Sequence, residues 1–258
     1  MAYRREKLSL HLHRTGDIFK ESIVVLARWN ELNSWLRLKE EIIKQGLLQK
    51  GARTTEFGIL REIRRRYISA AAWLPDAPRL GQFLSKEIPE IAKNQVLFVY
   101  TYFADPLVKL VFNKIRDGIP KGLLLRNTVI VNHLALLGSE VEASWSQSSL
   151  KKWAVKFKTM LRHAGYLNGN RMVKVYIREE VFAFFLLWLF FKMLSIKESL
   201  RHKVFDPLCL TDDDKMHLLK KGMEKDWWYY TEGGGLSEFI PKFKDMDNWI
   251  NGLEQKGI

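Results

Sequence analysis

The spacing of apolar residues along the chain predicts a mainly helical protein. In the segments 18–27 and 150–164, apolar residues recur at intervals of three and four, the period of a helix that buries one face. The segment 88–103 is apolar and aromatic with no turn signal inside it. We interpret it as a buried helix, with a β-strand as the alternative. The pattern therefore predicts a compact, mainly α, multi-helix globular fold.

Prolines and glycines divide this pattern into four parts. Pro75 and Pro78 separate an N-terminal group of helices from the rest, and glycines separate the later helices. We expect a helix-turn-helix module over residues 1–74 and a helical scaffold over 75–140. A second helix-turn-helix module follows over 141–178, with a core helix and a C-terminal helical part over 179–258.

The first module consists of a helix, a turn and a basic helix. Leu38 to Gln45 forms the first helix, and Gly46 lies where a left-handed C-cap falls. Thr54 or Thr55 is the expected N-cap of the second. One side of this second helix is apolar and the other is polar and basic. The apolar side carries Phe57, Leu60, Ile63 and Tyr67, and the opposite side carries Thr54, Gly58, Arg61 and Arg65. A recognition helix in a DNA groove has this pattern, and so does an ordinary solvated charged face.

The second module repeats the arrangement. Ser148 or Ser149 is the expected cap of a helix with one apolar face, and the opposite face is basic. That basic face carries Lys151, Val155, Lys158 and Arg162, flanked by Lys152, Lys156 and His163. Asn168-Gly169-Asn170 then predicts a tight β-hairpin continuing to Ile177, with Arg171 and Lys174 near its tip. The hairpin is a candidate wing. The alternative is an ordinary surface helix.

The most apolar run is too short to span a membrane. Residues 181–191 are uninterrupted apolar positions, whereas a spanning helix needs about 20. We therefore interpret this run as a core helix shared by both halves of the protein.

Composition points towards an anionic partner. The 258 residues include 42 Lys and Arg against 29 Asp and Glu, a formal charge of +13. A polyanion or an anionic membrane would account for this excess. The single cysteine, Cys209, excludes an internal disulfide and a cysteine-based zinc site. Residues 1–12 lack the apolar core of a secretion signal, which predicts a cytoplasmic location. Residues 1–14 form a basic leader that could follow a phosphate backbone or be a frayed terminus.

No catalytic or metal-binding motif stands out. The six histidines are scattered, and there is no His-Glu-x-x-His sequence or nucleophile elbow. Asp212 to Asp214 follow Thr211, where carboxylates favour the positive end of a helix dipole. We expect no metal, no cofactor and no enzymatic activity.

Several segments resemble the BrxA family, the small helical accessory components of bacteriophage exclusion (BREX) systems. The similar segments are Gly16–Glu21, Trp35, Gly46–Leu48, Leu60–Arg66 and Ser149–Leu167. The resemblance implies a compact helical protein with two helix-turn-helix modules that binds double-stranded DNA. It also implies a phage-defence setting with other BREX components as possible partners.

The residues and the resemblance together give one leading hypothesis, a non-enzymatic protein that binds the backbone of double-stranded DNA. The expected contact residues are Arg53, Thr54, Arg61, Arg65, Lys151, Lys152, Lys158, Arg162, Arg171 and Lys174. The protein is expected to be a monomer. A structural adaptor for other defence proteins is the main alternative, followed by RNA binding and a peripheral membrane role.

Overall fold

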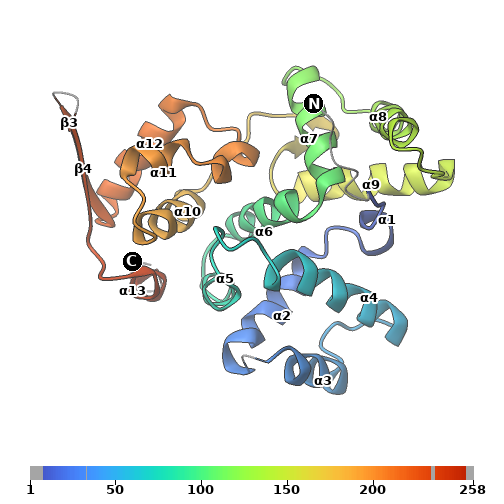
Figure 1. Ribbon diagram of the computed structural model, residues 1–258, viewed down its shortest axis with the longest axis horizontal. Coiled ribbons are helices and arrows are strands. Elements are labelled where there is room, and N and C mark those ends of the chain that lie inside the picture. The colour runs from blue at the N-terminus through green and yellow to red at the C-terminus, as the bar shows by residue number, and fades with distance from the viewer. Residues whose placement is uncertain (1–7, 33, 234–235, 254–258) are drawn as a thin grey trace.

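A helix that is buried on every side forms the centre of the molecule. The computed structural model describes residues 8–32, 34–233 and 236–253. In it, α6 (Glu90–Ala104) contacts elements from the N-terminal, middle and C-terminal parts of the chain (Figure 1). Every residue from Val96 to Thr101 of α6 is fully buried. The expectation of a buried helix over 88–103 is confirmed.

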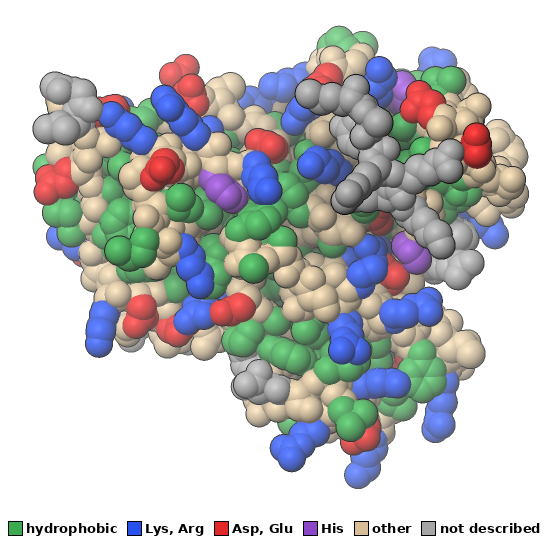
Figure 2. Space-filling model, in the orientation of Figure 1, with side chains coloured by type: hydrophobic (Ala, Val, Ile, Leu, Met, Phe, Trp, Pro, Cys, Tyr) green, Lys and Arg blue, Asp and Glu red, His purple; other side chains and the backbone are tan. Residues whose placement is uncertain are grey.

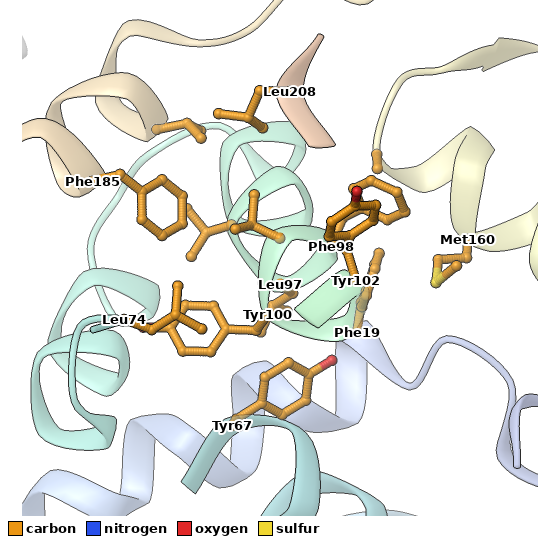
Figure 3. Packing of buried hydrophobic residues seen from close by; sticks show 14 of the residues in the cluster. Phe19, Tyr67, Leu74, Leu97, Phe98, Tyr100, Tyr102, Met160, Phe185 and Leu208 are labelled. Atoms are coloured by element: carbon orange, nitrogen blue, oxygen red, sulfur yellow. The ribbon is translucent and has the colours of Figure 1, made fainter. Parts of the chain in front are cut away.

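Aromatic side chains of α6 contact all three surrounding parts (Figure 3). The ring of Tyr100 lies 6.1 Å from that of Tyr67 and 6.4 Å from that of Phe185. On another side of the helix, Phe98 lies 4.9 Å from Tyr166. Because each part buries apolar area against the same helix, the core is continuous across the chain.

The N-terminal part is a group of helices, most of them below α6 in Figure 1, with the first helix to the right of α6. It contains α1 (Leu12–Thr15), α2 (Phe19–Leu32), α3 (Trp35–Gln45) and α4 (Arg53–Ile63). α4 runs directly into a π-helical turn, η1 (Arg64–Ile68), and α5 (Ala77–Leu84) then packs against α2. Gly46 adopts the left-handed conformation expected of it. Residues 1–7 of the basic leader lie outside the described residues.

The middle part contains α7 (Pro106–Gly118), α8 (Asn127–Glu140) and α9 (Gln147–His163). The predicted hairpin follows α9 as β1 (Leu167–Asn168) and β2 (Arg171–Met172), with Gly169 at a φ of +59° in the turn. Its strands are shorter than expected and do not continue to Ile177. The other edge of β2 hydrogen-bonds residues 122–125, through Gly122 N–H to Met172 O and Met172 N–H to Leu123 O.

The C-terminal part surrounds α10 (Glu179–Phe191), which is almost completely buried. It continues with α11 (Ile196–Arg201), the 3₁₀ turn η2 (Lys203–Leu208), α12 (Asp212–Glu224) and α13 (Met246–Gly252). The core-helix interpretation of residues 181–191 is confirmed. No single described helix is long and apolar enough to cross a membrane. α6 and α7 reach that length and composition together, but they are bent by 111°.

Part of this region is not helical, contrary to the sequence-based expectation. β3 (Trp228–Gly233) pairs with β4 (Leu236–Pro241) in an antiparallel hairpin. Trp228 on β3 is buried over Gly222 of α12 and donates its indole N–H to the carbonyl of Leu219. Trp227 and Trp228 therefore pack on the core, whereas Tyr229 on β3 is exposed.

The N-caps of the helices agree with the residue type expected at some helix starts and not at others. Asp105 caps α7 and Thr211 caps α12, and both are residue types that favour this position. The predicted caps of the two basic helices are wrong. α4 begins after Ala52 with no side-chain cap, and α9 is capped by Ser146, whose hydroxyl accepts a hydrogen bond from Ser149 N–H.

Two helical glycines should respond in opposite ways to the same substitution. A Cβ at Gly222 would lie 1.9 Å from Trp228 Cζ2, whereas a Cβ at Gly58 meets nothing within 4 Å. We expect Gly222→Ala to lower the free energy of unfolding by about 1–3 kcal/mol through overpacking. Gly58→Ala should raise it by about 0.5–1 kcal/mol through helix propensity. Urea denaturation measures both, and a stable Gly222→Ala would contradict the tight packing of β3 on α12.

Candidate nucleic-acid interface

The exposed face of α4 is basic, and two aromatic side chains, Phe57 of α4 and Trp35 of the neighbouring α3, lie beside cations there. Arg53, Thr54, Phe57, Arg61 and Arg64 are exposed. The ammonium of Lys39, from α3, lies 4.8 Å from the ring of Phe57, and the Arg64 guanidinium lies 5.6 Å from the ring of Trp35. Phe57 is thus on the solvent side, although its position predicted burial. The inward-facing positions are Glu56, Ile59, Leu60, Glu62 and Ile63.

The π-helical turn separates three consecutive arginines. Arg64 is exposed, Arg65 is partly buried and Arg66 is fully buried. Arg65 donates hydrogen bonds to the Glu62 carboxylate at 2.8 Å and to the carbonyl of Ala104 at 2.6 Å. The guanidinium of Arg65 is therefore engaged inside the protein. The candidate interface therefore includes Arg64 and not Arg65, which was expected from the sequence.

Glu62 is the centre of a buried charge cluster. Its carboxylate lies 3.5 Å from the Arg66 guanidinium and 3.6 Å from His11 Nδ1. Burial acts to raise the pKa of Glu62, but the hydrogen bond from Arg65 and the charge of Arg66 outweigh it and hold the pKa below its usual value. Burial also lowers the pKa of His11. The cluster therefore contains a carboxylate that stays ionised in a site almost closed to water.

The second basic helix, α9, contains five Lys or Arg residues and no Asp or Glu. Lys151, Lys152 and Arg162 are exposed, as predicted. Lys158 is buried, with 6% of its surface exposed, and burial and the neighbouring Arg162 lower its pKa. This position does not belong to the exposed stripe, and the partly exposed Thr159 lies there instead.

The two cations near the hairpin are tied to neighbouring elements. Arg171 is exposed and donates a hydrogen bond to the carbonyl of Gly122 at 3.0 Å. Lys174 Nζ lies 2.8 Å from Asp214 Oδ1, and with the Thr211 hydroxyl it lowers the pKa of Asp214 to about 2. Both cations remain at the surface, but Lys174 already has a carboxylate partner.

The short helix α1 and the loop after it connect the two basic helices. Arg66 donates to the carbonyls of Gly16 and Asp17. The Asp17 carboxylate in turn lies 2.6 Å from His163 Nδ1 at the end of α9. Lys156 of α9 passes against Gly16. Figure 1 shows α1 between α4 and α9, so the two helices are held in one fixed arrangement.

The excess positive charge of the protein comes from the first 186 residues, which include both basic helices. Residues 1–186 contain 31 Lys and Arg against 17 Asp and Glu, whereas residues 187–258 contain 11 and 12. Figure 2 shows Lys and Arg side chains gathered over the lower right of the molecule, where Figure 1 places α3 and α4. Among the described residues, no group of three or more potential metal ligands is present.

Comparisons with known proteins agree with the helical fold. The BrxA family model matches residues 6–186. A crystal structure of an uncharacterized protein from Magnetospirillum magneticum superposes with a TM-score of 0.54 at 18% sequence identity, covering 69% of this chain and 91% of the other. At that identity the similarity concerns the fold alone. No curated protein matches the chain.

Neighbouring arginines of the π-helical turn should have separate roles. Arg66→Met leaves the buried Glu62 without one of its cations and should lower the free energy of unfolding by about 3 kcal/mol. Arg64→Met changes an exposed side chain and should alter it by less than about 0.5 kcal/mol. Urea denaturation of both variants measures the difference. Equal stabilities would mean that Arg66 does not hold the Glu62 cluster together.

Proposed function

We propose that this chain, which belongs to the BrxA family, is a non-enzymatic protein that binds double-stranded DNA. The family associates it with bacteriophage exclusion systems. The observation that carries the DNA-binding proposal is the pair of exposed basic faces on α4 and α9, held together by α1. Lys and Arg stripes of this kind neutralise phosphates along a duplex.

The order of elements around α9 supports this proposal. We interpret α7, residues 122–125, α8, α9 and the β1–β2 hairpin as a winged helix, in which α9 is the recognition helix. This module begins at α7, earlier than residue 141. Residue 141 was the boundary expected from the sequence. The turn at Gly169 and the exposed Arg171 then lie where a wing would follow the phosphate backbone.

The N-terminal helices support a second DNA-binding module. We interpret α2, α3 and α4 as a three-helix helix-turn-helix, with α4 as the recognition helix. Its contacts would come from Arg53, Thr54, Arg61 and Arg64. We place the protein in the cytoplasm as a monomer, with other BREX components as further partners.

Charge reversal on either helix should weaken DNA binding. If about six phosphates are neutralised, the logarithm of affinity should fall with the logarithm of salt concentration with a slope near −5. Two double variants test this, Arg61→Glu with Arg64→Glu and Lys151→Glu with Lys152→Glu. Each should make that slope less negative by about 2. Fluorescence anisotropy with a short duplex at several salt concentrations measures this.

The matched control is Lys242→Glu with Lys244→Glu, which makes the same change in net charge at exposed positions far along the chain. It should leave the slope unchanged. If all three double variants bind alike, the interaction depends on net charge and the two helices do not form the site. If the unmodified protein prefers duplex RNA or single-stranded DNA, the proposal for duplex DNA fails.

A structural adaptor is the second candidate, and the C-terminal part favours it. Tyr229 and Ile240 face each other across the β3–β4 hairpin and are 44% and 48% exposed. This hairpin lies outside residues 6–186, which match the family. Under this alternative, reversing charges on α4 and α9 leaves DNA affinity unchanged and disrupts a complex with an acidic protein partner.

A further inference from the structure

Only one half of α9 is free to enter a DNA groove. Its C-terminal half lies against α1 and the following loop, through Lys156 beside Gly16 and His163 bonded to Asp17. The N-terminal half, from Gln147 to Val155, has no such cover among the described residues. The major groove of DNA is about 12 Å wide. Because a helix rises about 1.5 Å per residue, the length of α9 exceeds that width. Base contacts must therefore come from the free half.

The free half presents more than positive charge. Gln147, Lys151 and Val155 follow one another at intervals of four residues and lie along one side of the helix. All three are exposed, and Val155 keeps 47% of its surface in contact with solvent. Within the described part of the chain, no hydrogen bond to the Gln147 side chain is found. An amide, an ammonium and an isopropyl group are thus displayed in a row.

We propose that α9 reads A·T pairs, with Val155 against a thymine methyl group and Gln147 bonded to adenine. This inference rests on the proposed function. A glutamine amide can donate to adenine N7 and accept from adenine N6, and an apolar side chain distinguishes thymine by its methyl group. Lys151 and Lys152 lie between them and bind phosphates. The two reading positions are about 12 Å apart along the helix, or between three and four base-pair steps.

The other basic helix is a poorer reader. The exposed apolar residue of α4 is Phe57, and the ammonium of Lys39 lies 4.8 Å from its ring. That ring is already in contact with a cation and would have to lose it before meeting a base. Arg53, Arg61 and Arg64 around it suit phosphates. Sequence preference is therefore assigned to α9 and backbone binding to α4.

Base analogues test this inference without altering the phosphates. We would compare a short A·T-rich duplex with the same duplex carrying deoxyuridine in place of thymidine, which removes only the methyl group. The unmodified protein should bind the deoxyuridine duplex about fourfold more weakly for each contacted methyl group. Substituting 7-deazaadenine for adenine removes N7 and should weaken binding about fivefold. The salt slope should be the same for all three duplexes.

Two exposed substitutions complete the test. Val155→Ala should bind the thymidine and deoxyuridine duplexes equally, and it should remain sensitive to 7-deazaadenine. Gln147→Ala should show the reverse. If the unmodified protein binds all three duplexes alike, or if the variants keep the sensitivity assigned to the lost side chain, the A·T inference is wrong while DNA binding stands. If none of the duplexes is bound at low salt, the proposed function fails with it.

Discussion

Burial of α6 on every side is the constraint on which the rest of the structure depends. A helix that exposes no polar face must be covered all round, and no single neighbouring helix can do this. Tyr67, Tyr166 and Phe185 bring three separate parts of the chain against it. Each part thereby acquires a fixed position relative to the other two. The arrangement of the basic helices is a consequence of how α6 is covered.

Hydrogen bonds and ion pairs further fix the positions of α4 and α9 relative to each other. The Glu62 cluster joins α4 to the loop after α1 through Arg66, and Asp17 joins the same loop to α9 through His163. A buried charge cluster of this kind contributes little net stability compared with apolar residues, but it fixes geometry because each partner needs the others. If α4 and α9 bind DNA as proposed, the fixed arrangement would bring both to one duplex, and binding by the first would raise the effective concentration of the second. The rigid connection would then contribute to affinity without any additional contact.

Local signals in the sequence located some helix ends, although the N-caps expected for α4 and α9 were wrong. Gly46, Asp105 and Thr211 mark helix ends by chemistry that acts within a few residues, and the structure agrees with each. Whether each of the three consecutive arginines faces solvent or the interior does not depend on such local chemistry. A π-helical turn inserts one extra residue per turn, and it rotates Arg65 and Arg66 inward towards Glu62, Asp17 and Ala104. Helical periodicity also could not place Lys158, which lies at the edge of the exposed face and becomes buried.

The C-terminal part of the chain buries the apolar surface of α10. This helix is as apolar as a membrane segment, and residues 6–186, which match the family, end within it. α12 and α13 cover its surface, and Lys225 at the end of α12 lies 3.0 Å from the buried Glu180 at the start of α10. The part that covers α10 is nearly neutral, so it adds no further attraction to a polyanion. The residues that cover α10 are therefore different from those proposed to bind DNA, and the excess positive charge of the chain comes from its first 186 residues.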